Sequence, residues 1–198
     1  EATMQLAGDL TTADTFGFMF DINNFYFSYG WLHTWGGYVF GRDADGALNP
    51  ADIGLANEGA VAGAQALHDL RFALGLIPSG TNYDVANGLF VDGALGMIYT
   101  GPWAISQYQE VGLDVSVHPV PPLADGTPFS GFMGVQGVLV NSFSNLKVEA
   151  ANFSKWLSRK DAQVSMARLS GRIPASTSAL AEVLDDPVIA GFGEALLR

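Results

Sequence analysis

Two short apolar runs, each leading directly into a helix, restrict the fold of this chain more than any other feature. They are TFGFMF at residues 15–20 and ALGMIYT at residues 94–100, and both have the length and the aromatic or β-branched content of buried strands. The candidate helix caps after the first run are Asp21, Asn23 and Asn24. Pro102 follows the second run at the first position of a helix. Strands that alternate with helices are typical of an α/β fold.

The rest of the chain continues this alternation, with glycine and proline between the segments. A strand and a turn are predicted at residues 36–49, and further strands at residues 113–122 and 134–141. Helices are predicted at residues 56–78, 82–93, 145–169 and 176–196. In the first of these helices one face is predicted to carry Gly63, Leu67, Leu70 and Leu74, with Gly75 and Pro78 at its end. We therefore predict an α/β fold in which a central, largely parallel sheet is flanked by helices.

The segment FDINNFYFSYGWLHTWGGYVF at residues 20–40 holds nine aromatic side chains. A helix that only packs on a core needs one apolar stripe. Phe27, Trp31 and Trp35 form such a stripe, whereas Tyr26 lies on another line of the helix. Either several faces of this helix are buried, or one face is kept for a ligand that binds aromatic rings.

Composition excludes several classes of protein. The formal net charge is −11 and the isoelectric point is about 4.4, which has the wrong sign for binding nucleic acid or an anionic membrane. There is no cysteine, hence no disulfide, no thiol nucleophile and no thiolate metal site. No apolar run approaches the ~18 residues that a membrane-spanning helix needs.

Catalytic motifs are scarce. His33, His68 and His118 are far apart and have no metal-ligand spacing, so we expect them to be structural and expect no metal or cofactor. Nucleophile-elbow, phosphate-loop and dinucleotide motifs are all missing from the sequence. DADG at residues 43–46 lacks the glutamate of a calcium loop and fits a surface turn. A glycosidase needs two facing carboxylates, and the aromatic-rich segments hold only Asp21, which fits a cap better.

Binding residues are easier to propose. In open α/β sheets, ligands bind beyond the carboxyl ends of the strands. Asn24 and Tyr26 follow the first strand, Trp103 follows the second, and Tyr83 opens the helix at residues 82–93. A flat ring can pack on the axial C–H face of a pyranose, while an amide or phenol pairs with its hydroxyls. The alternative is that all four side chains belong to the core.

The same residues carry a resemblance to a known family. The segments FGFMFDINNFYFSYGWLHTWGGYVF, NYDVANGLFVDGALGMIYTGPWAI and FSGFMGVQGVLVNSFSNLKVEAANFSKWL together resemble the maltose/maltodextrin-binding proteins. These are family 1 extracellular solute-binding proteins that supply ABC sugar importers. The ALGMIYTGPW motif after a tyrosine-led helix and the later DPVIAG are the most specific parts of the resemblance, which covers nearly the whole chain in order.

The resemblance implies a domain organisation. Such proteins have two α/β lobes around a cleft that closes on the sugar. Residues 1–130 would form the sugar-binding C-terminal lobe, residues 131–171 would cross back to the N-terminal lobe, and residues 172–198 would return. Most of the N-terminal lobe would then lie outside this chain. The predicted strand at residues 134–141 would lack its sheet partners, so a homodimer or strand exchange is expected.

The resemblance also implies binding residues. Tyr26, Tyr83 and Trp103 match the aromatic sugar platforms of the family, Asn24 is a polar contact, and Tyr29 is a weaker candidate. Phe27, Trp31 and Trp35 are then assigned to the core. A family member carries a carboxylate at the Asn24 position and a proline at the Phe25 position. The neutral amide of Asn24 can still pair with a hydroxyl but forfeits the stronger charge-assisted bond, so the exact sugar stays open.

The function implied is that of a carrier and not an enzyme. The chain is expected to bind maltose or maltooligosaccharides for a membrane permease of an ABC importer, in an extracytoplasmic location. Three alternatives stay open: a lobe for another oligosaccharide such as trehalose or sucrose, a non-binding structural fragment, and a glycoside hydrolase subdomain.

Overall fold

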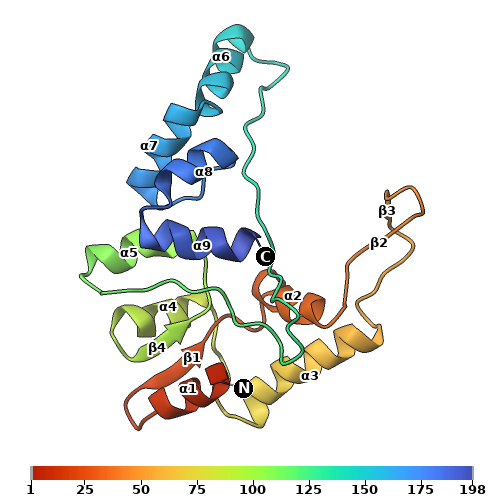
Figure 1. Ribbon diagram of the computed structural model, residues 1–198, viewed down its shortest axis with the longest axis vertical. Coiled ribbons are helices and arrows are strands. Elements are labelled where there is room, and N and C mark those ends of the chain that lie inside the picture. Colours follow the sequence, from red (N-terminus) through yellow and green to blue (C-terminus); the bar gives the residue numbers. More distant parts are fainter. Residues whose placement is uncertain (1, 198) are drawn as a thin grey trace. The chain divides into compact units, whose positions relative to one another are not determined.

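The computed structural model describes the backbone of residues 2–197 and the side chains of residues 4–195 (Figure 1). The chain divides into two compact units. The first contains the chain up to Thr100 together with Val120–Phe132, and the second contains Gly101–Pro119 together with the chain from Met133 onward.

The first unit contains both short sheets. Its elements are α1 (Ala2–Leu10), β1 (Phe16–Met19), α2 (Phe25–Thr34), β2 (Gly41–Arg42), β3 (Leu48–Asn49), α3 (Glu58–Phe72), α4 (Tyr83–Val91) and β4 (Leu95–Ile98). The elements described in the second unit are helical: the 3₁₀ turn η1 (Pro102–Ala104), α5 (Ile105–Glu110), α6 (Lys147–Leu157), α7 (Lys160–Ser170), α8 (Thr177–Val183) and α9 (Pro187–Leu197).

The two apolar runs pair with each other. β1 and β4 are parallel neighbours, with Phe16 opposite Leu95 and Met19 opposite Ile98. This confirms the predicted α/β class with a parallel sheet, although the parallel sheet of the described residues has only these two strands. β2 and β3 form a separate antiparallel hairpin around the DADG turn. The strand and turn predicted at residues 36–49 are therefore the two short strands of this hairpin and the turn between them.

The core of the first unit lies between the sheet and α2. Phe20, at the end of β1, is buried and stacks on Trp31 with ring centroids 5.8 Å apart. Phe27 and Trp31 are buried, and Trp35 packs against the same cluster while half-buried. The prediction that these three side chains of the aromatic helix belong to the core is therefore confirmed.

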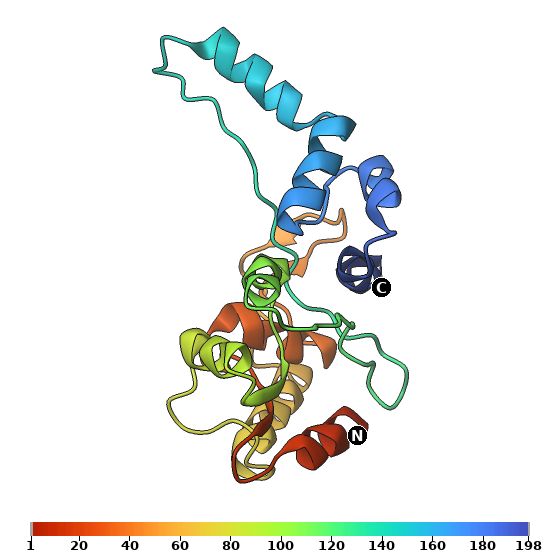
Figure 2. The same cartoon turned by 90° about the vertical axis from the view of Figure 1, so that its left-hand side faces the viewer.

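Helices α2 and α3 lie against each other at a distance that only glycine permits (Figure 2). A Cβ atom added at Gly63 would lie 2.5 Å from the carbonyl oxygen of Trp31 and 2.7 Å from Cα of Leu32. A Cβ atom at Gly59 would overlap the carbonyl of Trp35. Real Cβ atoms do not approach backbone atoms so closely, so both glycines set the spacing of the two helices.

The predicted helix at residues 56–78 extends too far. Helix α3 ends at Phe72, and Gly75 takes the left-handed conformation, φ +63°, that follows a helix end. Leu74 lies beyond the helix and is 52% exposed, so it does not share the buried face of Gly63 and Leu70. Gly75 thus follows the helix end as predicted, whereas the prediction that Leu74 shares the buried face is wrong.

Two predicted helices are each divided. The helix predicted at residues 145–169 is α6 and α7, separated at Ser158 and Arg159. The helix predicted at residues 176–196 is α8 and α9, because Pro187 cannot donate a backbone hydrogen bond inside a helix and begins a new one instead.

The predicted strands at residues 113–122 and 134–141 are irregular. A strand needs a neighbour that pairs with its N–H and C=O groups, and no described segment pairs with either. Residues 131–140 are all exposed, and Leu139 reaches 94%. The segment at residues 134–141 has the apolar pattern of a strand, but the pairing that would make it a strand does not occur within the described part of the chain.

The second unit has a small core of its own. Ala167, Val183 and Ile189 are buried where α7, α8 and α9 meet. Helix α6 contributes no fully buried residue, and its Phe153 and Trp156 are exposed and stacked on each other at 5.9 Å. This helix therefore presents an apolar surface that the described chain leaves uncovered.

Candidate functional site

The start of α2 positions the first two candidate residues. Asn24 is the N-cap, and its Oδ1 accepts a hydrogen bond from the backbone N–H of Tyr26 at 3.0 Å. Of the three caps that the sequence offered, Asn24 is therefore the one used. Because Oδ1 is occupied by the cap, the amide NH₂ of Asn24 is the group left for a ligand hydroxyl. Tyr26 is 40% exposed, as a binding role requires.

Phe27 joins Tyr26 to Tyr83. The Tyr26 ring meets the Phe27 ring edge-on at 5.5 Å, and the Tyr83 ring stacks on Phe27 at 6.0 Å with an interplanar angle of 13°. Tyr83 is half-buried at the first position of α4, where Asn82 caps the helix. The structure thus places Tyr26 and Tyr83 on the same buried ring, although they come from different helices.

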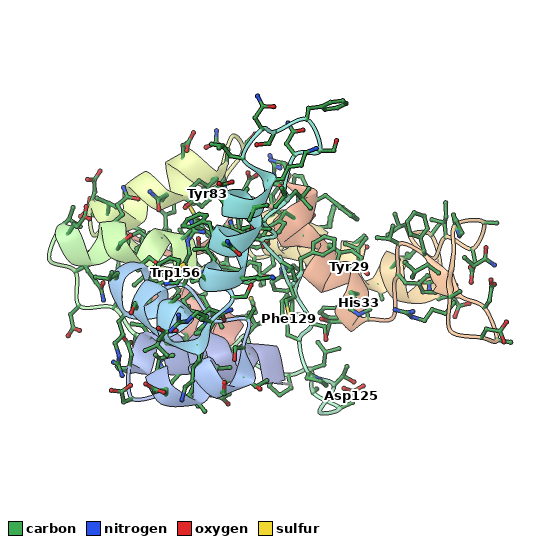
Figure 3. All side chains as sticks on the ribbon, turned by 90° about the horizontal axis from the view of Figure 1, so that it is seen from above. Tyr29, His33, Tyr83, Asp125, Phe129 and Trp156 are labelled. Carbon is green, nitrogen blue, oxygen red and sulfur yellow. The ribbon has the colours of Figure 1, made fainter. Side chains whose placement is uncertain are left out.

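Tyr29 lies one turn further along α2 and stacks on His33 at 5.3 Å (Figure 3). Its other face is covered by Phe132, whose ring lies 4.2 Å away at an angle of 22°. Phe132 also stacks on Tyr26 at 5.8 Å. Sequence reasoning missed Phe132, which precedes a predicted strand and carries no local signal for a place beside α2.

Tyr99 lies beneath this aromatic cluster. Its ring meets Phe20, Phe27 and Phe129 edge-on at 5.6–6.1 Å. Burial raises the pKa of Tyr99 to about 12, so its hydroxyl stays neutral throughout the physiological range. Tyr99 therefore contributes a neutral ring beneath the cluster.

Trp103 belongs to the second unit, in the 3₁₀ turn after Gly101. It is 44% exposed, whereas Trp31 in the core of the first unit is 6% exposed. A Cβ atom at Gly101 would overlap the indole of Trp103, so the glycine before Pro102 leaves the space in which the indole lies. The structure brings Tyr26, Tyr29 and Tyr83 together with Asn24 in the first unit, and the binding role of Trp103 stays a prediction.

Within the described residues, no group of three or more His, Cys, Asp or Glu side chains could hold a metal ion. None of the helices described there is both long and apolar enough to cross a membrane.

Neutral aromatic rings at a strand-to-helix junction of an α/β unit suit a protein that binds small neutral solutes. The chain matches the family of bacterial extracellular solute-binding proteins over residues 3–190, and it belongs to that family. This confirms the predicted class of a binding protein and the resemblance on which it was based.

Individual relatives fit the same class. The chain is 32% identical over 184 residues to the galactooligosaccharide-binding protein of Bacillus subtilis, covering 90% of this chain and 42% of that one. It is 29% identical over 169 residues to a maltooligosaccharide ABC transporter solute-binding lipoprotein of Streptococcus pneumoniae, covering 83% and 39%. The solved Thermus thermophilus maltotriose binding protein, bound with maltotriose, is 41% identical with a TM-score of 0.89, covering 98% of this chain and 52% of that one.

The chain therefore spans about half the length of the relatives that it matches. The similarity in fold extends over nearly all of this chain, which confirms the predicted kind of α/β lobe.

Proposed function

We propose that this chain is the sugar-binding part of an extracytoplasmic maltooligosaccharide-binding protein that serves the membrane permease of an ABC importer. The observation that carries the proposal is the cluster of Tyr26 and Tyr83 on Phe27, at the edge where β1 leads into α2. The names of the Streptococcus pneumoniae and Thermus thermophilus relatives support the ligand and the transport role.

The proposed site works by stacking. The rings of Tyr26 and Tyr83 offer faces to the C–H patches of glucose units, while the amide NH₂ of Asn24 donates to a hydroxyl. Because the amide is neutral, this contact is weaker than one made by a carboxylate. A stacking role is also proposed for Trp103, whose side chain is exposed.

A second sugar class has support of its own. One relative is named a galactooligosaccharide-binding protein, and this chain is 32% identical to it. Galactose differs from glucose in the axial hydroxyl that interrupts one ring face. A binding panel should therefore contain maltotriose, a galactooligosaccharide, trehalose and sucrose. If the galactooligosaccharide binds most tightly, it becomes the proposed ligand in place of a maltooligosaccharide, and the proposed transport role is unchanged.

This chain by itself is expected to bind maltotriose with a millimolar dissociation constant or more weakly. Stacking on exposed rings contributes roughly 1 kcal/mol per ring. Three rings therefore contribute about 3 kcal/mol, which falls short of an association cost of at least ~4 kcal/mol. Isothermal titration calorimetry with maltotriose measures this directly. A micromolar constant would show that the chain holds a complete site and that the assigned residues are wrong.

Variants locate the site. Tyr26→Ala should weaken binding about fivefold, the equivalent of ~1 kcal/mol. Phe72→Ala is the matched control, because Phe72 is an exposed aromatic residue, 68% accessible, at the end of α3. If Tyr26→Ala and Phe72→Ala bind maltotriose with equal affinity, Tyr26 is not part of the site.

The domain organisation remains part of the proposal. Residues 131–171 would complete a sheet in the half of the fold that the relatives have beyond this chain, and residues 172–198 would return to the lobe formed by residues 1–130. Support comes from the exposed apolar side chains of Met133, Val135, Leu139 and Phe143, and from the uncovered surface of α6. We propose a second copy of the chain as the partner that covers this surface.

Sedimentation velocity tests the last point. The chain is expected to form a homodimer, by strand exchange or edge pairing of residues 134–141, with a fraction that rises with protein concentration. Replacing Leu139 with lysine should return it to a monomer, since a charged side chain on an apolar edge blocks pairing. A monomer at every concentration would contradict the proposal.

A further inference from the structure

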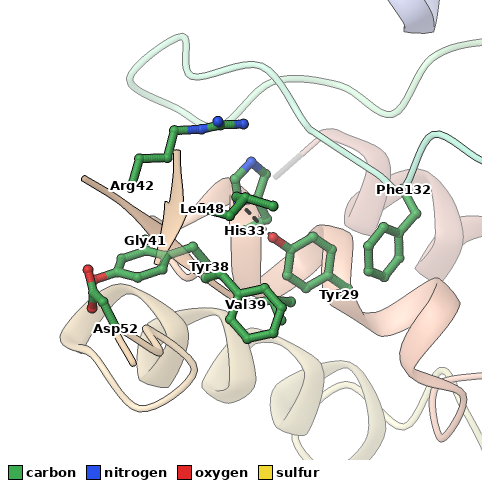
Figure 4. Close-up of a pocket in the computed structure, with 10 residues that line it drawn as sticks. Tyr29, His33, Tyr38, Val39, Gly41, Arg42, Leu48, Asp52 and Phe132 are labelled. Carbon is green, nitrogen blue, oxygen red and sulfur yellow. Dashed lines mark hydrogen bonds between the residues drawn. The ribbon is translucent and has the colours of Figure 1, made fainter. Parts of the chain in front are cut away.

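A hollow lies on the first unit, beside the hairpin of β2 and β3 (Figure 4). Its volume is about 630 Å³, which falls within the usual size of small-molecule sites. Of the candidate site residues, Tyr29 alone lines it. The side chains that matter for its chemistry are Tyr29, His33, Tyr38, Arg42, Asp52 and Phe132.

One wall of this hollow is aromatic. Phe132, Tyr29 and His33 form a continuous stack, with centroid separations of 4.2 Å and 5.3 Å and interplanar angles of 22° and 16°. Figure 4 shows the rings of Tyr29 and Phe132 side by side in this wall. Tyr29 and His33 are one helical turn apart on α2, so the wall is fixed to a regular element. Such a wall can pack against the C–H face of a sugar ring.

His33 also supplies a polar group. Its Nδ1 lies 2.7 Å from the carbonyl oxygen of Gly37, and a carbonyl oxygen can only accept. Nδ1 therefore carries the hydrogen, and in the neutral ring Nε2 is an acceptor. That assignment gives the aromatic wall an acceptor for a ligand hydroxyl.

The hairpin contributes donors and a carboxylate. The hydroxyl of Tyr38 donates to Oδ1 of Asp52 at 2.9 Å, which holds that carboxylate at the edge of the hollow. This hydrogen bond raises the pKa of Tyr38 and keeps the phenol protonated. Arg42 donates from Nη1 to the carbonyl oxygen of Gly46 at 2.6 Å, and a guanidinium has five N–H donors in all. Arg42 thus keeps donors for a ligand.

The mixture of charges favours a neutral ligand. Arg42 would attract an anion, but Asp52 lines the same hollow, and Asp43 and Asp45 lie in the turn of the hairpin. The net charge of the chain, −11, adds to the repulsion of anions. A sugar ring suits this mixture. Its hydroxyls can accept from the guanidinium of Arg42 and donate to the carboxylate of Asp52, while its apolar face packs on the aromatic wall.

We propose that this hollow is a distal sugar subsite, which holds a unit of a longer neutral oligosaccharide whose other end lies at Tyr26. The inference rests on the proposed function. Tyr26 and His33 are seven residues apart on α2, which is about 10 Å along a helix, so the two places are separated by a distance that an oligosaccharide can span. Phe132 contacts both Tyr26 and Tyr29 and links them.

Nuclear magnetic resonance on the full chain tests the subsite, because it detects weak binding residue by residue. The signals are the aromatic rings of Tyr26 and Tyr83, for the first site, and the Nε–H of Arg42 and the ring of Tyr38, for the hollow. Maltotriose should shift only the first set, and maltoheptaose should shift both sets.

The outcomes separate the two proposals. If maltoheptaose shifts Tyr26 and Tyr83 but leaves Arg42 and Tyr38 unchanged, the subsite is refuted and the proposed function stands. If neither sugar shifts any of these signals, both are refuted. The distal subsite is also refuted if maltotriose is enough to shift the signals of Arg42 and Tyr38. It is refuted as well if inorganic phosphate shifts these two signals and neither sugar does.

A variant measures how much the hollow contributes to the affinity for a longer oligosaccharide. Arg42→Ala should weaken the binding of maltoheptaose about tenfold, as expected for the loss of hydrogen bonds from a charged group. Its affinity for maltotriose should not change. Arg71→Ala is the matched control, because Arg71 is an arginine on α3 outside the hollow. If Arg42→Ala weakens the binding of maltotriose and maltoheptaose equally, the hollow is not a subsite that only longer oligosaccharides reach.

Discussion

Replacing Gly63 with alanine is expected to lower the free energy of unfolding by about 3 kcal/mol, the upper part of the usual range for overpacking. The new Cβ would lie 2.5 Å from the carbonyl oxygen of Trp31 and 2.7 Å from Cα of Leu32. Both are backbone atoms of α2, so no side-chain rotation relieves the overlap. The helices must move apart, and Trp31, which belongs to the core, must move with α2.

Gly88→Ala is the matched control for this change. Gly88 is also inside a helix, α4, but an added Cβ there would meet nothing within 4 Å. Alanine should therefore raise the free energy of unfolding by up to ~1 kcal/mol through its better helix propensity. Urea denaturation followed by circular dichroism measures both variants. A loss of similar size in the two would show that the helix spacing does not depend on Gly63.

Trp31→Ala is expected to cost about 3–5 kcal/mol, as truncation of a buried tryptophan does. Trp31 is 6% exposed and stacks on Phe20 at 5.8 Å and on Trp35 at 6.2 Å. Phe129 meets it edge-on at 5.5 Å. The cavity left by the indole would therefore lie between three other rings, which cannot close it without rearranging the core.

Trp103→Ala should cost much less stability, because 44% of that residue is already exposed. Both variants replace tryptophan with alanine, so the difference between their free energies of unfolding reports how deeply each indole is buried. Chemical denaturation should be followed by far-ultraviolet circular dichroism, since each variant removes a fluorophore. Equal losses would contradict the assignment of Trp103 to a binding surface.

Local signals made much of the fold predictable. The strand at residues 15–20, the strand at residues 94–100 and the helix start at Asn24 all depend on the chemistry of adjacent residues: apolar runs, a capping amide, and Pro102 at the first helical position. The same signals placed Tyr26 and Tyr83 at the starts of helices, where they are found. Each of these features is stabilised by hydrogen bonds or conformational limits within a few residues.

Adjacent residues are therefore enough to specify which segments are strands and helices at these junctions. Tertiary packing is needed to explain why residues 134–141 are irregular, since a strand exists only where a second segment pairs with it. Tertiary packing also decides that Phe132 stacks on Tyr29 and that Asp52 faces the same hollow as Arg42. These residues are distant along the chain, and packing between distant segments depends on the shapes of both surfaces, which no local pattern records.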